Sequence, residues 1–322
     1  MATSAKSVDE RLRRLAELKQ LPPESAKAEI RKALSDKTGL VVAKAANLAG
    51  EMKLQELIPD LVSAFALHTV NPERTDKGCA AKIAIVRALH NLDYDDTEIF
   101  EKGLTYVQLE STWGGKEDTA IPLRAASTIA LAARRHPRVL ELLIPAMMDG
   151  AAPVRAAAMR ALAATGRQEG QLLLRLKSLA GDSDEEVLTE CFCALLELGG
   201  ARALDFVAGF LDRGDDTKRT AAALAVGGSR LEQAFDVLHR QFLPGVDSAF
   251  RQVLLLAMSS MRDPRAMDFL LTLIRKGPFS DASETVRVLK SSRLDDRTRE
   301  RVRSAVMDRK DQQLLKVLDE PV

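Results

Sequence analysis

Aromatic side chains are scarce in this sequence, because Phe, Tyr and Trp together make up only 4% of its 322 residues. The buried surface must therefore come from Ala, Leu, Val, Ile and Met, in a chain of which 46% is hydrophobic. Ala and Leu are among the best helix formers, whereas aromatic residues are enriched in strands. The composition therefore predicts an all-α protein.

An excess of charge of either sign is also missing. Lys and Arg number 47 and Asp and Glu number 46, which gives a formal net charge of +1. A dedicated nucleic-acid binder normally carries a strong positive charge over its whole domain. The balance therefore argues against that class and leaves only local charged patches to consider.

Cysteines and long apolar runs are few as well. The three cysteines cannot form a full set of bridges, and a helix would point Cys191 and Cys193 about 200° apart, so we expect buried reduced thiols. No stretch approaches the roughly 18 uncharged apolar residues that a membrane span needs, and residues 1–15 lack the apolar core of a signal peptide. We expect a cytoplasmic protein without a membrane segment.

Internal repetition is what the sequence does have. The run Ala203–Val207 recurs at Ala234–Leu238 and at Ala266–Leu270, with offsets of 31 and 32 residues. A second element, Leu224–Arg230, is echoed 32 residues later at Leu256–Arg262. Two elements that repeat in step indicate an array of small structural units.

Each unit has the pattern of a helix pair. Apolar residues follow helical spacing in the stripe Val154, Ala157, Ala158, Ala161 and Leu162. Expected helix starts and ends are marked by N-capping Asp and by terminal Gly residues. These are Asp118, Asp184, Asp216 and Asp281 for the starts, and Gly50, Gly166 and Gly199 for the ends.

The order Leu142–Pro145, Asp149, then Val154–Ala158 and Leu162 resembles the HEAT repeat, in which a Pro-containing helix, an Asp turn and a Val-Arg helix follow one another. Leu57–Pro59 and Asp263–Ala266 are similar to the short HEAT repeats also seen in phycobilisome lyases, and 79–119 resembles a group of bacterial HEAT-repeat proteins. The resemblance implies a right-handed α-α superhelix of about eight helix pairs.

We therefore expect a single α-solenoid over 1–322, with an N-terminal helix or cap in 1–25, repeats in 26–293 and C-terminal capping helices in 294–322. Wider spacing in the N-terminal third points to insertions near 68–77 and 108–118. The expected starts of the second helices are Asp36, Asp76, Asp118, Pro153, Asp184, Asp216, Asp247 and Asp281. Insertions of this kind often lie at the binding edge of a solenoid.

The second insertion contains the only tryptophan, Trp113, beside Gly114 and Gly115. It could be an exposed anchor for a partner, or it could pack back between repeats. We favour packing, because Trp is usually largely buried. Lys116 follows a glycine, but the earlier Gly and the later Ser or Thr of a phosphate loop are absent.

Charge is distributed unevenly along the chain. Residues 181–216 have a balance of −8, residues 120–170 of +4 and residues 285–310 of +5. We expect Arg155 to reach neighbouring Asp groups in a ladder between repeats, and Arg134, Arg135 and Arg138 to lie at helix C-termini. A basic groove for an acidic peptide or a nucleic acid is the alternative. The candidate partner-binding residues are Trp113, Lys116, Arg124, Arg155 and Arg160.

The sequence offers no motif for catalysis, a cofactor or a metal. His68, His90, His136 and His239 are scattered over different units. The adjacent Asp pairs at 95–96, 215–216 and 295–296 are expected to cap helices.

We therefore expect a non-enzymatic scaffold that binds a protein or peptide in a groove formed by the second helices, from about Leu40 to Leu289. Two alternatives are kept. One is a relative of the HEAT-like alkylpurine DNA glycosylases, loosely suggested by Trp113, Asp118 and Arg155. The other is a lyase-like role in chromophore attachment.

Overall fold

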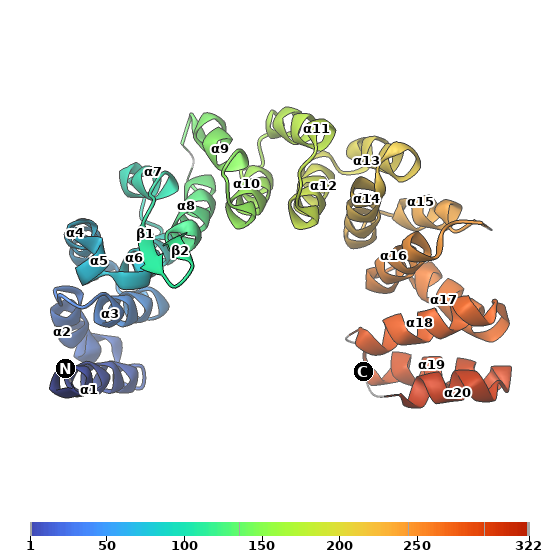
Figure 1. Ribbon diagram of the computed structural model, residues 1–322, viewed down its shortest axis with the longest axis horizontal. Helices are drawn as coiled ribbons and strands as arrows, with labels where there is room; N and C mark the ends of the chain where they lie inside the picture. The colour runs from blue at the N-terminus through green and yellow to red at the C-terminus, as the bar shows by residue number, and fades with distance from the viewer. Residues whose placement is uncertain (1, 135, 244, 293, 321–322) are drawn as a thin grey trace. The chain divides into compact units, whose positions relative to one another are not determined.

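The computed structural model describes residues 2–134, 136–243, 245–292 and 294–320. These residues form helices that follow one another in chain order, together with one small β hairpin (Figure 1). The first helices of the pairs are α2 (Pro23–Leu34), α4 (Ile58–Thr69), α7 (Glu98–Leu104), α9 (Val139–Met147), α11 (Gly170–Ala180), α13 (Ala201–Arg213), α15 (Ala234–Gln241) and α17 (Pro264–Lys276). Their partners are α3 (Gly39–Glu51), α6 (Ala80–Asn91), α8 (Ile121–Ala132), α10 (Ala152–Ala164), α12 (Glu185–Gly199), α14 (Asp216–Gly228), α16 (Ser248–Ser260) and α18 (Phe279–Ser291).

The eight predicted helix pairs are confirmed, and each second helix begins within four residues of its predicted start. α1 (Ala2–Leu18) precedes the pairs, and α19 (Asp296–Arg309) and α20 (Gln312–Asp319) follow them. The first predicted insertion contains α5 (Pro72–Thr75) and the 3₁₀ turn η2 (Lys77–Cys79), and another 3₁₀ turn, η1 (Gln55–Leu57), precedes α4. The second insertion is a β hairpin, which the all-α prediction did not include.

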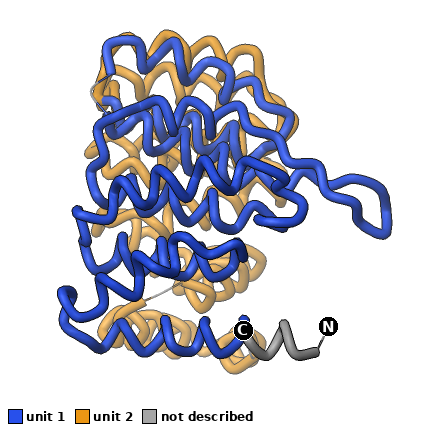
Figure 2. Tube along the Cα trace, turned by 90° about the vertical axis from the view of Figure 1, so that its left-hand side faces the viewer, with its two compact units in different colours: residues 1–165 blue, residues 166–322 orange. Residues whose placement is uncertain are grey.

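The chain divides into two compact units, residues 1–165 and 166–322, coloured separately in Figure 2. In the first unit α3, α6, α8 and α10 pack against one another in succession. In the second, α12, α14, α16 and α18 do the same. Packing between sequential helix pairs is the arrangement of a repeat protein. The single solenoid over 1–322 and its right-handed superhelical sense remain predictions.

Small residues allow the second helices to approach closely. A Cβ atom on Gly227 of α14 would lie only 2.5 Å from the carbonyl oxygen of Ala257 on α16. Ala221, Ala222 and Ala223 on the same helix are fully buried. The core therefore contains many short side chains, in agreement with a composition poor in aromatic residues.

Of the four predicted Asp caps, Asp184 is confirmed and the other three are not the N-caps of their helices. Asp184 accepts a hydrogen bond from the Val187 N–H at the start of α12. At α14 the cap is Asp215, and Asp216 is the first helical residue. Asp118 precedes the N-cap of α8 by two residues, although it accepts from the Ala120 N–H. Asp281 is wrong as a cap, because it lies inside α18 and is buried.

The adjacent Asp pairs do serve helix starts. Asp96 accepts from the Glu98 N–H before α7, and Asp295 accepts from the Thr298 N–H before α19. Asp215 accepts from the Lys218 N–H at 2.9 Å. The capping interpretation is confirmed for Asp215 and Asp295, whereas Asp96 precedes Thr97, the N-cap of α7.

The three cysteines are free thiols. Cys79 and Cys191 are buried, as expected, and Cys193 is half-buried. Burial raises the pKa of Cys79 and of Cys191 to about 12, and that of Cys193 to about 11. The thiols are therefore protonated near neutral pH, which disfavours nucleophilic chemistry. Among the described helices, none is long and apolar enough to cross a membrane.

Candidate functional site

The two insertions of the first unit meet in space. The side-chain amide of Gln108, just before β1 (Leu109–Thr112), donates to the carbonyl of Asp76 at 2.8 Å. The Gly78 N–H in η2 donates to the Glu110 carboxylate at 2.6 Å. Segments more than 30 residues apart in sequence thus form one composite element beside α6.

Glu110 is the centre of this contact. Besides Gly78, its Oε1 accepts from Gln108 Nε2 at 2.6 Å and from Thr119 Oγ1 at 3.0 Å. Burial raises the pKa of Glu110, but the hydrogen bonds from Gln108, Gly78 and Thr119 outweigh it and keep the pKa below its usual value. A carboxylate with three donors is held in one position, and it fixes the base of the hairpin.

A fully buried ion pair supports the first insertion. Lys82 Nζ lies 2.7 Å from Asp76 Oδ2, and neither side chain is exposed to solvent. Asp76 also accepts from the N–H groups of Ala81 and Lys82 at the start of α6. Lys82 Nζ donates to the carbonyl of His68 and lies 5.2 Å from the centre of the Tyr106 ring. These contacts compensate the desolvation of both charges.

The hairpin places Trp113 at its tip. β1 pairs with β2 (Gly115–Asp118) in antiparallel register, Thr112 opposite Gly115, so Trp113 and Gly114 form the turn. Figure 2 shows a two-armed loop of the 1–165 unit that extends beyond its helices. The Trp113 side chain has a relative exposure of 108%. The packing interpretation is therefore wrong, and Trp113 is an exposed side chain.

The other candidates lie in different environments. Lys116 is exposed on β2, close in sequence to Trp113. Arg124 on α8 is almost fully buried and binds Asp118 at 2.6 Å and Asp149 at 2.8 Å. Burial lowers the pKa of Arg124, but the hydrogen bonds that it donates to Asp149 and Asp118 outweigh this effect, so the pKa is raised overall. Arg124 is thus part of the framework.

Two further candidates are on α10. Arg155 donates to the carbonyls of Asp149 and Gly150, at 2.9 and 3.2 Å. Arg160 is exposed. Of the five candidates, the structure brings Trp113 and Lys116 together on one hairpin and leaves the three arginines on α8 and α10.

The predicted places of three other arginines are partly confirmed. Arg134 donates to the carbonyls of His90, in the last turn of α6, and of Tyr94, just past its end. Arg138 is exposed, immediately precedes α9 and binds Glu141, so its prediction at a helix C-terminus is wrong. Arg135 lies outside the described residues.

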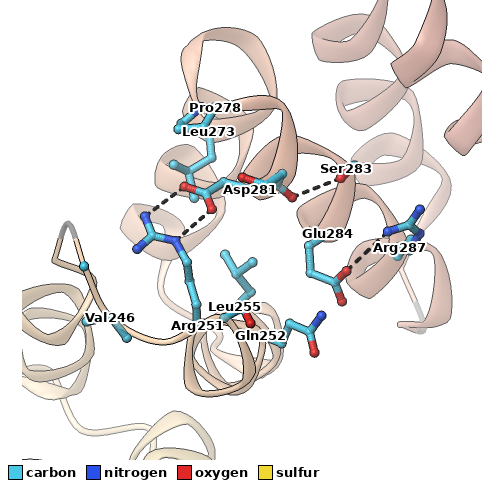
Figure 3. Close-up of a pocket in the computed structure, with 13 residues that line it drawn as sticks. Val246, Arg251, Gln252, Leu255, Leu273, Pro278, Asp281, Ser283, Glu284 and Arg287 are labelled. Atoms are coloured by element: carbon cyan, nitrogen blue, oxygen red, sulfur yellow. Dashed lines mark hydrogen bonds and ion pairs between the residues drawn. The ribbon is translucent and has the colours of Figure 1, made fainter.

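An Arg–Asp ladder is present within the described part of each unit, although the bonds given above for Arg155, for which it was expected, go to main-chain carbonyls. Besides Arg124, it includes Arg219, which lies 3.6 Å from Asp247 of the next pair. Arg251 forms a bidentate pair with Asp281 at 2.7 and 2.8 Å (Figure 3). Each of these arginines also donates to a carbonyl near the end of the preceding helix, namely those of Tyr106, Leu211 and Leu243.

A cleft of about 760 Å³ in the second unit lies over this last pair, between α16 and α18. Figure 3 shows Arg251 directed at Asp281, and Glu284 directed at Arg287. The charges that line the cleft are thus paired within the protein. This arrangement favours a structural role for the cleft.

No metal centre emerges from the described residues, where no group of three or more His, Cys, Asp or Glu could hold an ion. His68 is fully buried, and neither of its ring nitrogens has a hydrogen-bond partner among these residues. Of the three residues named for the glycosylase alternative, Trp113 lies at the tip of the hairpin and Arg155 on α10. Asp118 lies at the base of the hairpin and is bound to Arg124. At the usual rise per residue of a strand, the base is roughly 10 Å from the turn that carries Trp113.

Sequence reasoning missed Glu110, Gln108 and the Lys82–Asp76 pair. A usable signal was the alternation of apolar and polar residues in Val107-Gln-Leu-Glu-Ser111 ahead of a Gly-rich turn, which is typical of a hairpin strand. The alternation could not show which face is buried. The buried Lys82 has no sequence signal, because the residue is usually exposed.

Comparisons with known proteins bear on the fold. Residues 153–227 match the family of HEAT repeats. No curated protein matches the chain. Among solved structures, the complex of CpcE and CpcF of phycocyanin lyase from Nostoc sp. PCC7120 is similar over 93% of this chain and 94% of that chain, with 17% identity and a TM-score of 0.35. A likeness this weak carries no argument about function. The family match and the sequential helix pairs lead to one conclusion: the chain contains HEAT repeats.

Proposed function

We propose that this protein is a non-enzymatic scaffold that binds a partner protein, and that the β1–β2 hairpin is a principal contact. The observation that carries the proposal is the exposure of Trp113 at the tip of an anchored hairpin. Trp is enriched among the residues that dominate binding energy at protein interfaces. A fully solvated indole contributes no packing energy to the isolated chain, whereas its burial in a partner's pocket would stabilise the complex.

The anchoring of the hairpin supports this role. Glu110 and Gln108 tie β1 to the first insertion, so the base of the hairpin is held before a partner arrives. Preorganisation of this kind reduces the conformational entropy lost on binding. Repeat proteins commonly use such an inserted loop beside the repeats for recognition.

The basic groove is less favoured as a nucleic-acid site. Arg124 is directed at Asp118 and Asp149, and Arg134 is directed at main-chain carbonyls. These contacts direct the two guanidinium groups inward, where a phosphate backbone would not meet them. The chromophore-attachment alternative stays a prediction.

The proposal is tested by affinity capture from native lysate with three baits: the wild-type chain, Trp113→Ala and Leu172→Ala. Leu172 on α11 is a matched control, since it is 72% exposed in the other unit. We expect a reproducible partner protein with the wild type and with Leu172→Ala, and its loss with Trp113→Ala. Capture of nucleic acid without a reproducible protein would overturn the proposal, and the salt dependence of that binding would identify a phosphate contact.

A further inference from the structure

Strand β1 has its polar residues inside and its apolar residues outside. Gln108 and Glu110 are 3% and 7% exposed, whereas Val107 and Leu109, at alternate positions, are 56% and 50% exposed. Half-buried strands normally show the reverse order. The outward face therefore carries apolar surface that the described chain does not cover.

The outer edge of β1 also has unpaired backbone groups. The Thr119 N–H donates to the Gln108 carbonyl at 2.9 Å. In an antiparallel pair, the backbone N–H and C=O groups of successive residues point alternately toward the partner strand and away from it. The Thr119–Gln108 bond and the observed register show that Glu110 and Thr112 direct their backbone groups across the hairpin. Leu109 and Ser111 direct theirs outward, where no described residue forms a hydrogen bond with them.

From these two features we infer that an extended segment of the partner protein adds to the β1 edge as a third strand; this inference rests on the proposed function. The segment would hydrogen-bond to Leu109 and Ser111 and place apolar side chains at alternate positions beside Val107 and Leu109. A second copy of this chain fits less well. Side chains of directly opposed residues point to the same face, so pairing two β1 edges would leave both apolar faces in water, whereas the rest of a partner protein can cover the face that its segment extends.

The experiment removes a single outward backbone donor. Ser111→Pro deletes the outward N–H. The bonds across the hairpin remain, because the backbone groups of Ser111 point outward and Pro is tolerated at a strand edge. Ser111→Ala keeps the N–H and is the first control. Glu117→Ala changes an exposed side chain on β2 without removing a backbone donor and is the second control.

The probe is a displayed library of random decapeptides, selected on the full wild-type chain, and binding is followed by the fluorescence of Trp113, the only tryptophan. We expect selected peptides with alternating apolar residues and a blue shift of Trp113 emission. Ser111→Pro should raise their Kd about tenfold, the effect of roughly one hydrogen bond, while both controls leave it within about twofold. Circular dichroism checks that each variant remains folded.

Equal binding to Ser111→Pro, or a selection that yields no peptide dependent on the Ser111 N–H, overturns strand addition. A concentration-dependent dimer that Ser111→Pro abolishes also overturns it, because the occupant is then a second copy. If lysate capture is lost with Trp113→Ala and kept with Ser111→Pro, the scaffold function stands and only the mode of binding fails.

Discussion

At the scale of single residues, two buried charged groups organise the first unit. Glu110 accepts three hydrogen bonds and joins the insertions, and Asp76 neutralises Lys82 while it binds the first turn of α6. A buried charge is tolerated only when it has such partners. Each is therefore a position where one substitution should have a large effect.

Replacing Glu110 with Ala leaves the Gly78 N–H and the Gln108 amide without their acceptor. We expect the free energy of unfolding of the first unit to fall by about 2–3 kcal/mol, measured by urea denaturation. Glu117, directly opposite Glu110 in the hairpin and exposed, is the matched control. A loss of equal size with Glu117→Ala would contradict the anchoring role of Glu110.

The lowered pKa of Glu110 predicts that its contribution to the stability of the first unit depends on pH in the acid range. The folded-state pKa of Glu110 lies below its usual value, so its contribution is fully present above the unfolded pKa of about 4.3. The contribution is lost as pH falls through the lower, folded pKa. The stability difference between wild type and Glu110→Gln should therefore shrink as pH falls below about 4. A difference that is constant with pH would contradict this assignment.

Lys82→Met leaves Asp76 buried without its cation. We expect the free energy of unfolding to fall by about 3–5 kcal/mol, the range for a buried ion pair that has lost one partner. Asp76→Asn combined with Lys82→Met should cost less than the sum of the single changes. Lys102→Met is the control, because Lys102 forms an exposed pair with Glu98 and should cost less than about 0.5 kcal/mol. If the two changes lowered the free energy of unfolding additively, Asp76 and Lys82 would not interact as a pair.

At the scale of elements, the hairpin and the helices have different origins. Helical periodicity specifies each helix pair locally, and Asp caps add to it at α12, α14, α16 and α17. An isolated two-stranded hairpin is marginal in water, so β1 and β2 depend on the contacts of Glu110 and Gln108 with the first insertion. The hairpin is therefore an element that tertiary structure supports.

The pair α16–α18 offers a test of the ladder. Arg251 binds Asp281 with two hydrogen bonds and lies 4.0 Å from the centre of the Phe242 ring. Lys cannot reproduce this planar geometry, so Arg251→Lys should lower the free energy of unfolding by about 1–2 kcal/mol in urea denaturation. Arg287→Lys, at the exposed pair with Glu284, should have little effect. Equal losses would show that bidentate pairing is unimportant.

At the scale of the whole molecule, helix pairs within each unit contact their neighbours in sequence, so we expect the stability of a unit to be approximately a sum of local contributions. We expect Lys82→Met to speed amide hydrogen exchange in residues 1–165 while α16 and α18 keep wild-type protection. Hydrogen exchange read by mass spectrometry tests this. Equal acceleration in α16 and α18 would indicate one cooperative unit.

The sequence by itself determined the number, order and starts of the helix pairs. These depend on the 31- to 35-residue repeat, on Ala- and Leu-rich stripes and on caps such as Asp184, all of which are local. It also determined where the two insertions lie. Of the candidate site, it predicted Trp113 and Lys116 but favoured the wrong environment for Trp113.

Which side chains of the insertions are buried and which are exposed depends on the tertiary structure. The alternation in β1 permits either face to be buried, and the choice depends on Glu110 meeting Gly78, 32 residues away in sequence. Once that face is fixed, Val107, Leu109 and Trp113 are left exposed. Burial of Lys82 likewise required Asp76 and the His68 carbonyl to meet in space. Contacts between distant segments therefore determined the candidate binding surface, whereas local periodicity determined the helices that hold it.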